Sequence, residues 1–476
     1  MNNKLYQVVG VTALLTLLLS TAGCLTLGRN TLFLNADREY QLGNYTAART
    51  IVENNKSEFY RDQDQVLYHL EAGMLSFYNQ SAADAIGHLE KAEQLIEEYY
   101  TKSITQAAGS WLINDLQVDY SGEDFEDIYC NIFKALSYLQ LGDKDAAFVE
   151  VRRTNTKLDL LEDKYLPLTQ AYNQSNDASG VSITTGSSRF YNSALASYLS
   201  LLMYRAAENY DGVRIDWQRL QEAFTRQPEL YPFAIPFTDA ITLPQDRTRL
   251  SILAFTGRSP VKLTSTLWIQ TQENRVYITA ASEHDQIGQT LSQYLDFEFP
   301  GIKAGYRFKF EIPRMETQGS DVHRIQVVAN GRVLGELGLL EDLQRITLDT
   351  FSIREPLILL RSAARTIIKG IASEAAGSSI EKVGAESGSL LLEILGYVGR
   401  KAVETATEIS EQADLRVSRY FPAFVHAGEW DLLPGEYEVQ IKYYGIQGLL
   451  YTDDLGKIVL GSNKNNLNLI TSVFSR

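Results

Sequence analysis

The sequence predicts a multidomain α plus β protein. We expect an N-terminal tetratricopeptide-like α-helical array and a C-terminal β-sandwich-like body that carries a helical hairpin insertion. Two observations lead to this class. Apolar residues recur at helical spacing from about residue 30 to 230, and from residue 248 onward the spacing changes to alternation. The chain has 476 residues, enough for about three structural units.

The first 23 residues are typical of a lipoprotein signal peptide. Lys4 precedes an uncharged apolar run from Val8 to Leu19. As a helix this run would span only about 18 Å, which is too short for a bilayer core of roughly 30 Å. It ends in Ser20-Thr21-Ala22-Gly23-Cys24, and small residues directly before a cysteine are similar to the bacterial lipobox. An ordinary secretory signal is the alternative, since Thr21 stands where Leu is usual.

We therefore expect Cys24 to be acylated and to begin the mature chain. Acylation would make membrane lipid the first partner of the protein and would hold it in the cell envelope. Leu25 follows the cysteine, and no Asp is present there to retain the protein at the inner membrane. In a bacterium with two membranes the outer membrane is therefore favoured.

Composition excludes several classes of function. Asp and Glu number 59 against 44 Lys and Arg, and the net charge of −15 argues against a nucleic-acid partner. With Cys24 acylated, Cys130 has no partner for an intrachain disulfide. Five scattered histidines do not predict a metal site, and no cofactor is expected. The His-Glu-x-x-His, Walker and Gly-x-Ser-x-Gly motifs are absent from the sequence, so no catalytic residue is predicted.

Similar turns recur through residues 24–230, the expected helical domain. They are Leu42-Gly43-Asn44-Tyr45, Leu141-Gly142-Asp143-Lys144 and Glu208-Asn209-Tyr210. In each case an apolar helix runs into the turn, and a small or apolar residue (Ala48, Ala147 or Val213) follows in the next helix, as in tetratricopeptide helix-turn-helix units. Stacked units share a core and leave a concave surface that commonly binds peptides. A plain helical bundle without such a groove is the alternative.

A Pro-rich connector over residues 231–247 precedes the β-rich domain, which we assign to residues 248–353 and 413–476. Apolar side chains alternate with polar ones in Tyr306–Ile312 and again in Tyr437–Tyr443, as in strands with one buried face. Asn330-Gly331 predicts a hairpin with a type I′ turn. Asp453–Gly456 is a second expected turn.

Residues 354–412 interrupt the strands with helical periodicity and form the expected hairpin insertion. Arg361, Arg365 and Lys369 make a basic stripe at i, i+4 and i+8. The stripe indicates either a solvated helix face or a contact with an acidic partner or anionic headgroups. The apolar faces of the same helices could also mediate self-association.

Several motifs together resemble those of one protein family. They are Asp119-Tyr120-Ser121-Gly122-Glu123-Asp124-Phe125-Glu126, Ala135–Leu139, Leu141–Asp143, Val149–Asn155, Leu340–Leu343, Ala413–Arg416 and Leu433–Tyr437. They are similar to those of a family of bacterial envelope lipoproteins with tetratricopeptide-like N-terminal helices. That family carries no established enzyme activity, so the resemblance implies an architecture and a location rather than a reaction.

Six residues of these motifs form a candidate polar anchor or structural network: Asp119, Tyr120, Glu123, Glu150, Arg152 and Arg153. Arginine pairs well with carboxylates, often through two hydrogen bonds. We expect one of the arginines to pin the 119–126 loop against the helices. The alternatives are an anchor for the carboxylate or sugar of a partner, and catalysis.

The sequence thus predicts a lipid-anchored cell-envelope protein that is not an enzyme. It would act as a protein-binding scaffold or adaptor, holding an envelope protein or peptide in a tetratricopeptide-like groove. The alternative is an envelope or peptidoglycan hydrolase whose site is not recognisable from the sequence.

Overall fold

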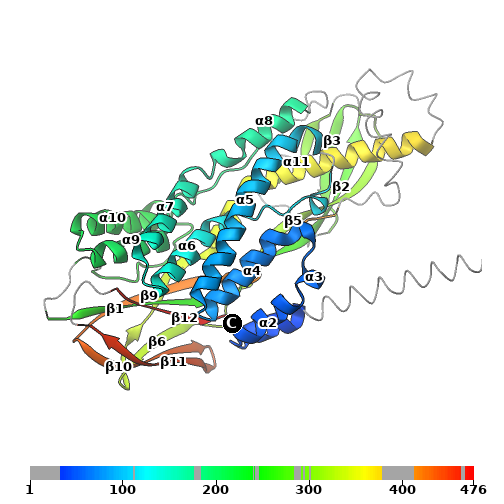
Figure 1. Ribbon diagram of the computed structural model, residues 1–476. Helices are drawn as coiled ribbons and strands as arrows, with labels where there is room; N and C mark the ends of the chain where they lie inside the picture. The colour runs from blue at the N-terminus through cyan, green and yellow to red at the C-terminus, as the bar shows by residue number, and fades with distance from the viewer. Residues whose placement is uncertain are drawn as a thin grey trace, which may run out of the picture.

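The computed structural model describes residues 33–110, 113–175, 184–239, 241, 246–282, 291–292, 295–299, 302–377, 412–461 and 467–476. Over these residues the protein is mixed α/β, with a helical N-terminal region and a C-terminal region built mainly of antiparallel sheets (Figure 1). The signal peptide, Cys24 and residues 378–411 of the expected insertion lie outside the described residues. None of the described helices is both long enough and apolar enough to cross a membrane.

The described N-terminal region begins with a helix over residues 33–41 and continues as a series of helices. The further helices are α2 (Tyr45–Asn54), α3 (Lys56–Phe59), α4 (Gln65–Tyr78), α5 (Ala82–Ser110), α6 (Asp124–Gln140), α7 (Lys144–Asp159), α8 (Leu166–Ser175), α9 (Ala194–Ala206) and α10 (Tyr210–Arg226).

The expected turns end one helix and begin the next. Gly43, Gly142 and Glu208 have positive φ angles of 79°, 80° and 55°, which close the preceding helix in the left-handed conformation. The Asp143 side chain then accepts a hydrogen bond from the Ala146 N–H at 3.0 Å and caps α7. The N-terminal helical region predicted from the sequence is confirmed, because its helices end and begin at these local turn and capping residues.

In the described part of the chain, twelve strands form three sheets of four strands each. The first has the order β12 (Asn468–Phe474), β1 (Thr248–Thr256), β9 (Phe424–Leu432), β8 (Gly338–Asp342). The second has the order β11 (Gly448–Leu460), β10 (Gly435–Gly445), β6 (Arg324–Ala329), β7 (Arg332–Glu336). The third has the order β4 (Asp296–Glu298), β3 (Arg275–Ala280), β2 (Val261–Gln272), β5 (Arg307–Glu316). β12 runs parallel to β1, and the other described pairs are antiparallel.

Strand β1 is buried along its whole length because it has a partner layer on each side. Leu250 and Ile252 belong to an apolar cluster with residues of β6 and β10, so the second sheet covers one face of the first. Phe255 belongs instead to the core of the helices, with ring centroids 5.3 Å from Phe133 and 6.0 Å from Phe77. The regions predicted as a helical domain and a β-rich domain therefore share one core.

The strand predictions are confirmed for β5 and β10, and Asn330 and Gly331 form the β6–β7 hairpin with φ angles of 49° and 73°. The turn expected at Asp453–Gly456 is wrong. These residues lie inside β11, where the register against β10 shifts by a bulge, and the turn is at residues 446–447.

The helix expected from residue 354 begins earlier, at Leu343. This helix, α11, extends to Gly377 with Pro356 inside it. Its start is explained by Asp342, whose side chain accepts hydrogen bonds from the N–H groups of Gln344 and Arg345 at 3.0 and 3.1 Å. The apolar residues of α11 from Leu357 to Ile368 are mostly buried within this chain, so this stretch leaves little apolar surface for self-association.

We predict that Phe255→Ala lowers the free energy of unfolding by about 3–5 kcal/mol, because it removes a ring shared by helices and sheet. Helical circular dichroism and tryptophan fluorescence should lose their signals in a single, coincident transition during urea unfolding. Val333→Ala is the control, since this side chain is 57% exposed and its loss should change stability by less than about 0.5 kcal/mol. Two separate transitions in the wild type would contradict the shared core.

Candidate functional site

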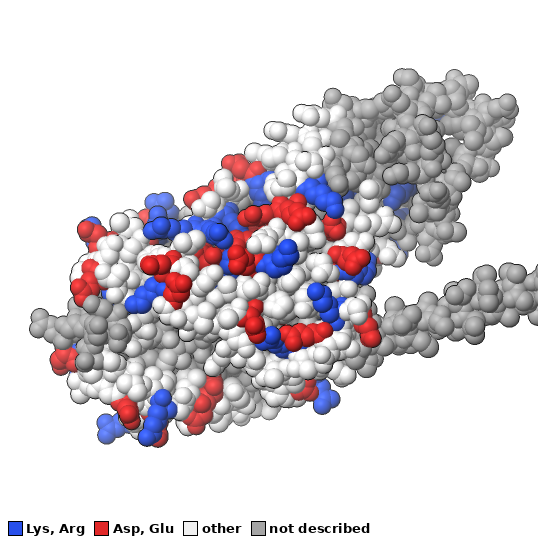
Figure 2. Space-filling view, in the orientation of Figure 1, with Lys and Arg blue, Asp and Glu red and all other residues white. Residues whose placement is uncertain are grey.

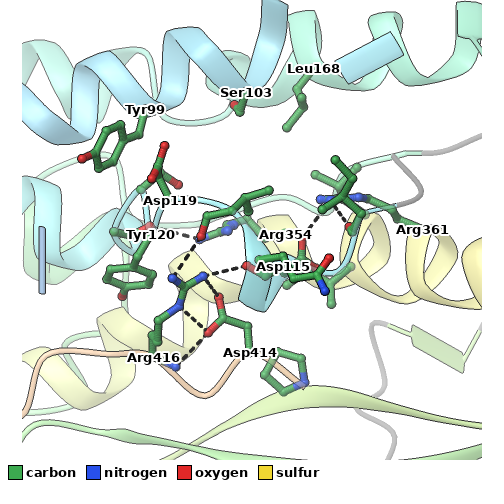
Figure 3. Close-up of a pocket in the computed structure, with 18 of the residues that line it drawn as sticks. Tyr99, Ser103, Asp115, Asp119, Tyr120, Leu168, Arg354, Arg361, Asp414 and Arg416 are labelled. Carbon is green, nitrogen blue, oxygen red and sulfur yellow. Dashed lines mark hydrogen bonds and ion pairs between the residues drawn. The ribbon is translucent and has the colours of Figure 1, made fainter. Parts of the chain in front are cut away.

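A cavity of about 410 Å³, lined by tyrosines and charged side chains, lies where the helical region meets α11 and the extended segment 412–416 (Figure 3). Residues of α5, the 113–122 segment, α8 and β5 complete its wall. Five tyrosines line it, together with six basic and four acidic side chains. These are Tyr99, Tyr100, Tyr120, Tyr165, Tyr172, Lys102, Lys164, Lys262, Arg354, Arg361, Arg416, Asp115, Asp119, Glu311 and Asp414.

The 113–122 segment of the wall is held at its start by two arginines of α11. Arg361 and Arg365 donate hydrogen bonds to the Ile113 carbonyl, and their guanidinium nitrogens lie 2.8 and 3.5 Å from the Asp115 carboxylate oxygens. Burial alone would raise the pKa of Asp115, but the charges of these arginines outweigh it and lower the pKa to about 2. Asp115 therefore stays ionised under ordinary conditions.

Two further arginines hold the rest of the segment. Arg416 donates to the carbonyls of Asp115 and Val118 at 2.7 and 3.1 Å, and it pairs with Asp414 at 2.8 Å and with Asp64 at 3.2 Å. Arg354 donates to the Gly122 carbonyl at 3.2 Å. Contacts within the protein thus hold this part of the cavity wall.

The beginning of α6 lies directly behind this wall. Glu123 pairs with Lys262 at 2.5 Å and with Arg354 at 3.0 Å, and their charges lower its pKa although burial raises it. Glu126 accepts hydrogen bonds from the Tyr120 hydroxyl and from the N–H groups of Glu123 and Ser418 at 2.5–2.7 Å. Burial, together with the negative charge of Glu123, raises the pKa of Glu126 to about 7.

Five of the six predicted anchor residues form two groups, one at the cavity and one around Glu93. Asp119 and Tyr120 line the cavity, and Glu123 stands behind it. Glu150 and Arg153 lie in a separate ion-pair network around Glu93 of α5.

Arg152 does not pin the 119–126 loop, and this expectation is wrong. Its guanidinium lies over the Phe148 ring at 5.8 Å, whereas Asp119 pairs with Lys102 of α5 at 2.5 Å. The physical reason is that α7 packs on α6 and α9, whereas the basic partners of the loop are Lys102 of α5, Lys262 and Arg354.

The basic stripe is not a solvated face. Arg361 and Arg365 contact the 113–115 segment of the same chain, and only 1% of Arg365 is exposed. Lys369, one turn farther along α11, is half-buried and does not line the cavity.

The sequence did not reveal the site roles of Lys164, Lys262, Arg354 or the four tyrosines outside the loop. Arg416 stood in a recognised motif, and its spacing of two residues from Asp414 was the available signal for an ion pair.

Neither a protein-family model, nor a curated protein, nor a solved structure matches this chain. Among the described side chains, no group of three or more His, Cys, Asp or Glu is arranged to hold a metal ion. The described lining offers hydrogen-bond donors and acceptors together with tyrosine rings.

A double-mutant cycle should distinguish the real contacts of the loop from the expected one. We predict that Asp115→Ala and Arg361→Ala are coupled by about 1–3 kcal/mol in unfolding free energy, because they remove one partly buried pair. Asp119→Ala and Arg152→Ala should instead be additive within about 0.5 kcal/mol. Coupling of the second pair without coupling of the first would contradict the geometry.

The raised pKa of Glu126 predicts a pH-dependent stability. Between about pH 4.5 and 7 the folded protein binds a proton at Glu126 that the unfolded chain has released. The contribution is therefore complete at low pH and is lost as pH rises through 7, with a total of about 3 kcal/mol. Glu126→Gln removes this titration, so the difference in unfolding free energy between wild type and variant should change across that window. A difference that is constant with pH would refute the assignment.

Proposed function

We propose that the protein is a lipid-anchored scaffold or adaptor of the cell envelope that binds its partner without catalysis. The observation that carries this proposal is the cavity, whose wall is held in place by arginine contacts to backbone and carboxylates. A site fixed in advance loses little conformational entropy on binding. We expect the partner to be an envelope protein or peptide, or a component attached to it.

A tetratricopeptide-like arrangement of the helices is part of the proposal. Successive helices pack on one another, α4 on α5, α5 on α6 and α6 on α7, as stacked hairpins do. Against these helices lies the chain's own extended segment: Arg419 pairs with Glu71 of α4 at 3.1 Å, and the Ser418 N–H donates to Glu126 of α6. Because α4 and α6 already hold this segment of the chain, we propose that the partner binds at the cavity instead.

Two carboxyl groups at or behind the cavity wall, Asp115 and Glu126, lack the properties of a general acid, which supports binding over hydrolysis. A general acid needs a pKa near the working pH and access to the substrate. Asp115 has access but a pKa of about 2, whereas Glu126 has a pKa of about 7 but is fully buried behind Tyr120. The alternative, a peptidoglycan hydrolase, predicts turnover that Glu126→Gln abolishes.

Attachment by an acylated Cys24 at the outer membrane is the remaining part of the proposal. We expect the intact mass of the purified protein to show acyl chains on a chain that begins at Cys24. Wild type should float with membranes in a density gradient, and Cys24→Ser should remain in the soluble fraction. A free thiol at Cys24 would exclude the anchor.

Filling the cavity should abolish binding. Ser103 of α5 lines the cavity, so Ser103→Trp should reduce cross-linking to the envelope partner at least about tenfold. Thr101→Trp is the matched control, because Thr101 lies on the same helix, is exposed and does not line the cavity. Equal loss in both variants, or release of soluble fragments from peptidoglycan by the wild type, would overturn the proposal.

A further inference from the structure

We propose that the cavity recognises a neutral saccharide unit, as found in an envelope glycan. This inference rests on the proposed function, in that it takes the cavity as a binding site, and it names the chemistry of the ligand. It follows from the charge, the aromatic content and the neutral polar groups of the lining.

Each described basic side chain of the lining is already paired within the protein, with Glu123 serving both Lys262 and Arg354. Each of these six side chains has a carboxylate oxygen 2.5–3.0 Å away. An anionic ligand would have to compete with these carboxylates for the same cations. A neutral ligand can form hydrogen bonds to these ion pairs without breaking them. A paired carboxylate retains lone pairs that accept, and a paired guanidinium retains N–H groups that donate. The face drawn in Figure 2 also shows acidic and basic side chains interleaved, without a large area of one sign.

The aromatic side chains among the described residues of the lining are all tyrosines. Tyrosine combines a flat apolar face with a polar edge, so it suits ligands that are apolar on one side and hydroxylated on the other. The hydroxyls of Tyr120 and Tyr165 are held by Glu126 and Asp124, which fixes the orientation of both rings. Tyr99 is half-buried beside Asp119 and presents its ring near the paired charges (Figure 3).

Neutral polar side chains complete the lining. Three amides, Gln63, Gln117 and Gln412, and three hydroxyls, Ser103, Ser121 and Ser362, border the cavity. Each amide and each hydroxyl can both donate and accept a hydrogen bond, and so can every hydroxyl of a sugar. A volume of about 410 Å³ lies within the range of roughly 300–1,000 Å³ typical of small-ligand sites.

The test is calorimetric titration of the full-length lipidated protein in detergent micelles. The probes are N,N′-diacetylchitobiose, cellobiose and maltose, with inorganic phosphate and glutarate as anionic comparisons. We expect at least one disaccharide to bind at millimolar or lower concentration. Tyr99→Ala should weaken that binding about tenfold, because it removes the ring, while Tyr99→Phe should retain it. Tyr210→Ala is the control, since Tyr210 lies on α10, is 58% exposed and does not line the cavity.

Three results would overturn the inference: none of the disaccharides binds, only phosphate or glutarate binds, or disaccharide binding is unaffected by both Tyr99→Ala and Ser103→Trp. The second variant keeps the test decisive if the first one folds poorly. If the saccharides fail while Ser103→Trp still abolishes partner cross-linking, the saccharide inference fails alone. Hydrolysis of the bound disaccharide would overturn the proposed function instead.

Discussion

Buried carboxylates at the junction of helices and sheets are the constraint on which the rest of the structure depends. Glu341 of β8 is fully buried among the helices and accepts hydrogen bonds from the hydroxyls of Tyr129, Ser193 and Tyr231 and from the Leu195 N–H, at 2.5–2.9 Å. A buried carboxyl group that lost these donors would cost several kcal/mol. The helices therefore cannot move away from the first sheet as a separate body.

A second such group lies on the neighbouring strand. Glu429 of β9 pairs with Arg205 of α9 at 2.6 Å and with Arg249 of β1 at 3.4 Å, and it accepts a hydrogen bond from Tyr198. Because Glu341, Glu429 and Glu126 all take donors from distant parts of the chain, they fix the position of the sheets relative to the helices. The shape of the cavity depends on this arrangement, because its wall is built from both the helical N-terminal region and the C-terminal region.

The secondary structure could be predicted from local patterns in the sequence. The pairing of residues that are far apart in the chain could not. Alternation over Tyr437–Tyr443 predicts β10 because side chains of a strand point to opposite faces, whatever lies on either side. The basic stripe of α11 shows the limit of such reasoning. Its spacing places the arginines on one side of a helix, but the partner of Arg361 is Asp115, 246 residues earlier in the chain. The bulge at Gly456 depends on the pairing of β11 with β10, and the ion pair between Asp119 and Lys102 depends on how the loop packs against α5.

The parallel pairing of β12 with β1 has a consequence for the order in which the molecule can assemble. β1 is covered on one edge by β9 and on the other by β12, and the Ser475 hydroxyl donates to the Tyr40 carbonyl at 2.8 Å. During synthesis β1 emerges more than 160 residues before β9 and more than 200 residues before β12, so both of its edges stay open until the last part of the chain is made. A chaperone that shields an exposed strand edge would thus be needed longest here, and truncation after β11 would leave an aggregation-prone fragment.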